Sequence, residues 1–91
     1  MAFMLTRAQV GDYEAWKERF DSDPPGARQS ATGYRVMRSV EDPNVVYIQV
    51  EFPTREAAED ARRRLLESGV LDRLEGHTGP AVVEEAEAVG V

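Results

Sequence analysis

The side chains best suited to chemistry in this sequence include a single histidine, His77. Histidine is the side chain type that exchanges protons most readily near neutral pH. The surrounding Gly76-His77-Thr78-Gly79 predicts a loop at the end of a sheet, which suits the rim of a pocket. Two interpretations stay open, a catalytic proton-transfer residue and a solvated loop histidine.

Arg35 is the second candidate. It belongs to the β-rich run 33–40, and the pairing expected below places it on an apolar face beside Met37, Ile48 and Val50. A buried cation without a partner is costly, so this guanidinium must reach an edge, form an ion pair or bind an anion. In the last case it would hold an enolate or a carboxylate.

Aromatic residues form the third group of candidates. Trp16 falls on one helical face with Tyr13 and Phe20, which indicates a core or pocket-wall residue and also permits stacking on an aromatic ligand. Tyr34, Arg38 and Tyr47 are expected on the opposite sheet face from Arg35. There they would line a cavity or make hydrogen bonds across a dimer interface.

A predicted hairpin positions most of these residues. The runs 33–40 and 45–52 are rich in β-formers and flank Glu41-Asp42-Pro43-Asn44, which is typical of a turn. If Val40 faces Val45, one face carries Arg35 and Met37 under the helices. The other face then carries an exposed apolar patch, which is typical of an interface: Tyr34, Val36, Val40, Val45 and Tyr47.

The remaining elements follow from periodicity and end signals. A strand is expected over 2–10 and a helix from Tyr13 to about Asp21, with Asp12 as its cap and Pro24 and Pro25 as its stop. A second helix is expected from a Thr54 cap to Gly69, with small alanines on its buried stripe.

A last strand is expected from Ala81 to about Val89. The order strand, helix, strand, strand, helix, strand predicts an α+β, ferredoxin-like fold with a four-stranded antiparallel sheet and both helices on one face. The first and third strands are then central. We expect residues 1–91 to form one domain.

Composition narrows the function classes. The net charge of −6 disfavours binding to nucleic acid or to an anionic membrane surface, and no stretch is long and apolar enough to span a bilayer. The absence of cysteine excludes disulfides and thiolate chemistry and fits a cytoplasmic protein. We see no metal-ligand cluster and no dinucleotide fingerprint in the sequence, so neither a metal nor a cofactor is expected.

Three segments carry a resemblance to a known group of proteins. They are 10–17 (Val-Gly-Asp-Tyr-Glu-Ala-Trp-Lys), the hairpin from Gly33 through Asn44, and Val50-Glu51-Phe52 before the alanine-rich helix. In these the chain resembles the small dimeric α+β barrel proteins of the antibiotic biosynthesis monooxygenase-like superfamily. The resemblance implies a homodimer joined sheet to sheet, with one small-molecule pocket per protomer between sheet and helices.

Two functions are consistent with this resemblance. The first is a cofactor-independent enzyme, monooxygenase-, cyclase- or isomerase-like, acting on an aromatic or polyketide-like substrate. Arg35 and His77 would be its catalytic residues, and Trp16, Tyr34, Arg38 and Tyr47 would bind the substrate. The alternative is a non-catalytic dimeric ligand-binding or interaction module of the same fold.

Overall fold

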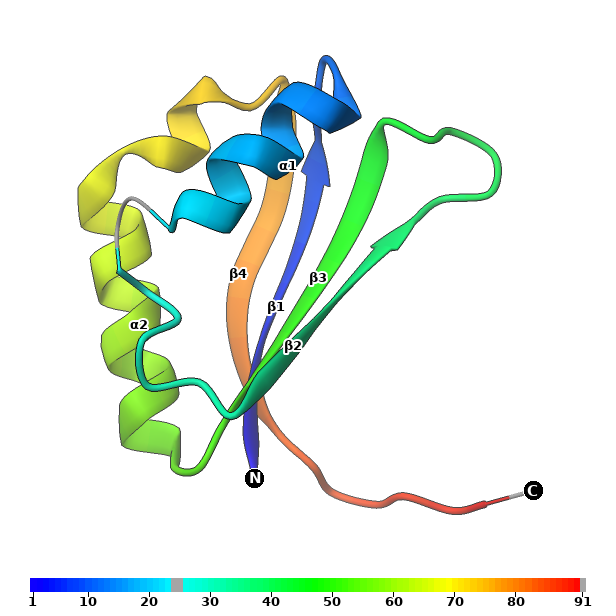
Figure 1. The fold of residues 1–91 in the computed structure, drawn as a ribbon. Helices are drawn as coiled ribbons and strands as arrows, with labels where there is room; N and C mark the ends of the chain where they lie inside the picture. The colour runs from blue at the N-terminus through cyan, green and yellow to red at the C-terminus, as the bar shows by residue number, and fades with distance from the viewer. Residues whose placement is uncertain (24–25, 91) are drawn as a thin grey trace.

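A four-stranded antiparallel sheet with two helices makes up the computed structural model, which describes residues 1–23 and 26–90 (Figure 1). The chain runs in the order βαββαβ, as the sequence predicts, with a short 3-10 helix before the last strand. The elements are β1 (Ala2–Gln9), α1 (Tyr13–Ser22), β2 (Gly33–Arg38), β3 (Val45–Phe52), α2 (Arg55–Ser68), η1 (Val70–Arg73) and β4 (Gly76–Glu84).

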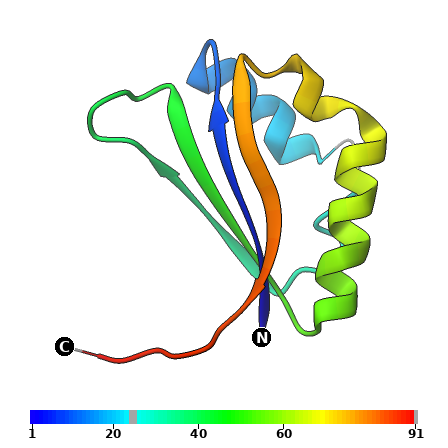
Figure 2. The ribbon, with the colours of Figure 1, turned by 180° about the vertical axis from the view of Figure 1, so that it is seen from behind.

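The sheet order is β2-β3-β1-β4, so β1 and β3 are central and β2 and β4 are edges, as predicted. Both α1 and α2 cover the same face of the sheet, and the other face has no helix over it (Figures 1 and 2). Alternate residues of β1, among them Ala2, Met4 and Ala8, are buried under the helices, whereas Leu5 and Arg7 face the open side. We call these two sides the helix face and the open face.

Side-chain caps fix the helix ends at the predicted residues. The Asp12 carboxylate accepts a hydrogen bond from the Ala15 amide at 3.0 Å, and the Thr54 hydroxyl accepts one from the Ala57 amide at 3.1 Å. Gly69 ends α2 with a left-handed backbone, φ 76°. The helix stop predicted at Pro24 and Pro25 lies outside the described residues. No helix in the described ranges has the length and apolar character to cross a membrane.

The predicted pairing of the hairpin is wrong by one residue. Arg38 pairs with Val46 and Arg35 with Gln49, so Val40 does not face Val45. The cause lies in the connection, because the Ser39 hydroxyl accepts hydrogen bonds from the amides of residues 41 and 42 at 3.2 and 3.3 Å. These bonds end the strand at residue 38 and place Val40 in a loop, fully exposed.

A shift of one residue exchanges the two faces of a strand. Tyr34, Val36 and Arg38 therefore lie on the helix face, and Arg35 and Met37 lie on the open face, the reverse of the prediction. Of the five residues predicted to form an exposed apolar patch on the face without helices, only Tyr47 is exposed there. The large apolar residues that the open face does expose are Leu5, Met37, Tyr47 and Val83, with exposed fractions of 38 to 45%.

The last strand begins earlier than predicted. Residues 76–78, expected as a loop, pair with residues 9 to 7 of β1, and residues 85–90 continue past the sheet outside the strand. The glycines that suggested a loop belong instead to a β-bulge, because the pairing of β4 with β1 shifts by one residue opposite Thr6. Gly79 has φ 87°, and a Cβ on it would lie 2.6 Å from the Leu5 carbonyl oxygen.

We expect Gly79→Ala to destabilise the protein by about 1 to 3 kcal/mol, because alanine is strained at positive φ and its Cβ would meet backbone. Gly33→Ala is the matched control, since no atom lies within 4 Å of a Cβ there. That control should be neutral or stabilising by at most about 1 kcal/mol. Urea unfolding measures both. Equal stability of the two variants would contradict the close approach at the bulge.

Candidate functional site

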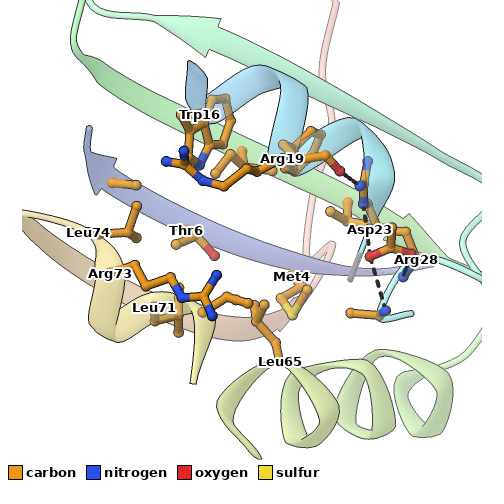
Figure 3. A pocket seen from close by; sticks show the side chains of 16 residues that line it. Met4, Thr6, Trp16, Arg19, Asp23, Arg28, Leu65, Leu71, Arg73 and Leu74 are labelled. Atoms are coloured by element: carbon orange, nitrogen blue, oxygen red, sulfur yellow. Dashed lines mark hydrogen bonds and ion pairs between the residues drawn. The ribbon is translucent and has the colours of Figure 1, made fainter. Parts of the chain in front are cut away.

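A cavity of about 120 Å³ lies between the sheet and the helices (Figure 3). Its floor is formed by alternate residues of β1 and β3, one wall by aromatic residues of α1, and the other wall by leucines of α2 and of the segment around η1. These lining residues are mainly apolar: Met4, Ala8, Trp16, Phe20, Ile48, Val50, Leu65, Leu71 and Leu74. A cavity of this kind suits a small apolar or aromatic group.

The aromatic wall is built by helical spacing. Trp16 is buried, and its ring stacks on Phe20 with centroids 4.9 Å apart and planes at 29°. Tyr13 extends the row at 5.9 Å from Trp16, and the Tyr34 ring of β2 meets Phe20 edge-on at 5.5 Å. Of these four rings Trp16 and Phe20 line the cavity, while Tyr13 and Tyr34 pack against them and support their positions.

One buried polar side chain lies on the floor of the cavity. Thr6 occupies an alternate position of β1 otherwise taken by Met4 and Ala8, and 8% of its surface is exposed. Figure 3 places it between the aromatic wall and Arg73. Among the described residues no hydrogen bond is made by its hydroxyl, so this group can serve a polar substituent of a ligand.

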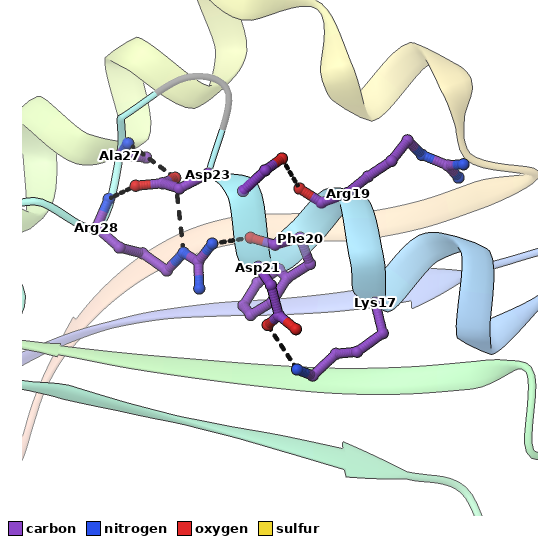
Figure 4. A network of polar contacts seen from close by, with 8 residues as sticks. Lys17, Arg19, Phe20, Asp21, Asp23, Ala27 and Arg28 are labelled. Atoms are coloured by element: carbon purple, nitrogen blue, oxygen red, sulfur yellow. Dashed lines mark hydrogen bonds and ion pairs between the residues drawn. The ribbon is translucent and has the colours of Figure 1, made fainter.

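Arg28 contacts the aromatic wall at Phe20, near the C-terminal end of α1 (Figure 4). Its guanidinium lies 3.7 Å from the Phe20 ring centroid, donates a hydrogen bond to the Phe20 carbonyl oxygen and pairs with the Asp23 carboxylate at 3.6 Å. That carboxylate also accepts hydrogen bonds from the amides of Ala27 and Arg28 at 3.2 and 3.1 Å. Both charges are thereby compensated within the fold.

Two other arginines at the cavity are not engaged in this way. Arg19 of α1 and Arg73 of η1 are exposed residues that line the cavity, so they mark its mouth, one on each side (Figure 3). In the described part of the chain neither guanidinium forms an ion pair or a hydrogen bond. By contrast, arginines 55, 63 and 64 pair with carboxylates on the surface of α2.

The predicted site residues divide among three places. Trp16 lines the cavity; Tyr34 and Arg38 lie on the helix face beside it, with the Arg38 guanidinium 3.8 Å from the Tyr13 ring centroid. Arg35 and Tyr47 lie on the open face, so the prediction that Arg35 sits under the helices is wrong.

His77 is an exposed residue of β4 and not a loop residue. Its Nδ1 lies 2.9 Å from the Gly79 carbonyl oxygen, and it is not among the described residues that line the cavity. The structure therefore does not bring His77 together with Trp16. Its proposed role in proton transfer stays a prediction.

Sequence reasoning missed Thr6, Arg19 and Arg73. A signal exists for Thr6, because it is the one polar residue in the alternating set at positions 2, 4, 6 and 8. The two arginines carry no such signal. They come from segments 54 residues apart in the chain, and only the fold brings both to one cavity.

Replacing Arg28 with Met should lower the free energy of unfolding by about 1.5 to 3 kcal/mol, because it removes charge-assisted hydrogen bonds from a largely buried side chain. Arg55→Met is the matched control, since Arg55 is 58% exposed and its ion pairs with Glu59 and Glu84 should each contribute less than about 1 kcal/mol. Urea unfolding followed by Trp16 fluorescence measures both losses. An equal loss in the two variants would contradict the anchoring role of Arg28.

Comparison with known proteins places this geometry in a described fold. No protein-family model matches the chain, and no curated protein matches its sequence. Solved structures do match. One is named "Putative antibiotic biosynthesis monooxygenase from Nitrosomonas europaea"; it is 20% identical, has a TM-score of 0.64, and the match covers 96% of this chain and 100% of that one.

Two further structures agree with the first. One from Deinococcus radiodurans, named in the same way, is 14% identical with a TM-score of 0.63, over 100% of this chain and 98% of that one. One from Mycobacterium tuberculosis is 14% identical with a TM-score of 0.64, over 98% of each chain. At these identities the likeness establishes the fold. The chain has the ferredoxin-like fold of the antibiotic biosynthesis monooxygenase-like proteins, as its sequence motifs suggest.

Proposed function

We propose that the protein is a cofactor-independent enzyme that takes up an aromatic substrate in the cavity between the sheet and the helices. The observation that carries the proposal is the apolar cavity with the Trp16–Phe20 wall and the single polar Thr6 hydroxyl on its floor. The names of the structures with the same fold support a monooxygenase-like reaction.

The volume of the cavity favours a small substrate. Apolar cavities of about 150 Å³ accept one benzene ring, whereas sites for drug-sized molecules measure about 300 to 1,000 Å³. At about 120 Å³ the cavity matches one ring. A polycyclic, polyketide-like substrate would require α1 or η1 to move outward.

The cavity would orient the substrate and exclude water from it. The substrate itself would supply the electrons that reduce O₂, so no cofactor is needed. In the monooxygenase version, a phenol and O₂ give a para-quinone and water. One oxygen atom enters the ring, and the other leaves as water with the two hydrogens that the phenol loses. Cyclase- and isomerase-like reactions require only proton transfers within the substrate.

A non-catalytic ligand-binding module is the second candidate. It is favoured by one observation: the only carboxylate among the described lining residues is that of Asp23, which Arg28 and two amides already occupy. His77 lies away from the lining. Chromatography of a bound phenol after incubation in air distinguishes the two candidates, because only the enzyme yields a new product faster than the protein-free solution.

Phenol should quench or shift Trp16 fluorescence saturably, since the ring of Trp16 lines the cavity. Ala8→Leu adds three carbons to a fully buried position of the floor and should weaken binding at least fivefold. Ala15→Leu, on the exposed side of α1, is the matched control and should bind as the unaltered protein does. Unchanged affinity of the Ala8→Leu protein would show that the ligand binds elsewhere.

A homodimer joined through the open face completes the proposal. Four large apolar side chains, Leu5, Met37, Tyr47 and Val83, are each exposed by about two fifths on this face. Leu5, Met37 and Tyr47 line a shallow depression to which β1, β2, β3 and β4 all contribute residues. Exposed apolar surface of this extent on a sheet is typical of an interface, and two such faces together would form the dimeric α+β barrel.

Leu5→Glu should convert the dimer to a monomer of 10.2 kDa, because it places a charge at the centre of the proposed interface. Leu66→Glu is the matched control, since Leu66 is similarly exposed, at 44% against 39%, but lies on α2. Light scattering at micromolar concentration reports both masses. A monomeric unaltered protein would rule out the barrel.

A further inference from the structure

The mouth of the cavity has a charge opposite to that of the whole protein. The chain carries a net charge of −6, yet the charged side chains that line the cavity are Arg19, Arg28, Arg73 and Asp23. Arg28 and Asp23 compensate each other. The two remaining guanidinium groups give the mouth a local excess of positive charge.

These two arginines differ from the other cations on the helix side of the molecule. Arg38 donates to the Pro43 carbonyl oxygen at 3.0 Å and Arg62 to the Pro80 carbonyl oxygen at 2.8 Å, so each is committed to the fold. Across the described residues, Arg19 and Arg73 have no such partner, although they come from two different elements and line the same cavity. Their stems add to the apolar wall, and their heads reach solvent.

The ring-sized cavity and the two arginines at its mouth together specify a ligand class. An anion bound at the mouth would be attracted by both guanidinium groups at the edge of an apolar, low-dielectric space, where charge-assisted hydrogen bonds are strong. Arginine also presents its donors in a planar fork that matches a carboxylate. A neutral ring of the same size would gain only the apolar contacts.

We propose that the cavity binds a one-ring aromatic carboxylate, with its ring against Trp16 and Phe20 and its carboxylate held by Arg19 and Arg73. This rests on the proposed function and names the substrate class of the same site. It replaces Arg35, which faces the open side of the sheet, as the residue that holds an anion. The Thr6 hydroxyl on the floor is available to a second polar group on the ring.

Calorimetric titration with benzoate and with benzyl alcohol, a neutral ring of similar size, tests the proposal. The unaltered protein should bind benzoate at least tenfold more tightly, and this preference should decrease with added salt. The double variant Arg19→Met/Arg73→Met should lose the preference and keep its affinity for benzyl alcohol. Circular dichroism confirms that the variant is folded.

Two single variants serve as controls. Arg63→Met removes an equal charge from the exposed surface of α2 and should keep the preference, as should Arg35→Met on the open face. Loss of the preference in either control would overturn the assignment to Arg19 and Arg73. Equal affinity of the unaltered protein for both ligands would overturn the inference alone, whereas failure of both ligands to bind would overturn the proposed function with it.

Discussion

The cavity depends on a difference in side-chain size between the two helices. Ala58 and Ala61 are fully or almost fully buried, and these small residues let α2 approach the sheet closely. On α1 the contacting residues are Tyr13, Trp16 and Phe20, whose rings hold the helix farther from the strands. The strand side chains project from the sheet to about the same height everywhere. They therefore fill the space under the near helix, α2, but leave a gap under the more distant helix, α1. The space that results lies beside the aromatic rings.

The position of α1 over the sheet also requires specific contacts, because a short helix that rests on large side chains could pack in several orientations. Arg28 restricts it from the far side by stacking on the Phe20 ring and bonding to the Phe20 carbonyl oxygen at the end of the helix. Asp23, in a left-handed conformation with φ 45°, turns the chain and fixes Arg28 through the backbone. These contacts hold Phe20 in position, and a binding surface that is preorganised in this way lowers the entropic cost of binding a ligand.

The two faces of the sheet differ in what covers them. The described residues form two α-helices, α1 and α2, and both lie on one side of the sheet. The open face therefore retains exposed apolar side chains that no helix covers, and for this reason we propose a second copy of the chain as their partner. In the proposed dimer the pocket and the interface would share β1 and β3 but use opposite side chains of each strand.

The sequence by itself determined the element order, the helix caps and the central position of β1 and β3, because these depend on short-range signals and on alternation within one strand. The tertiary structure decided the faces of β2, since hydrogen bonds of the Ser39 hydroxyl shorten that strand and shift its pairing by one residue. It also decided the start of β4, where pairing with the full length of β1 overrides the glycines. Above all, it alone brought Arg19 and Arg73 to one cavity, because no local pattern encodes the meeting of two surface residues from distant segments.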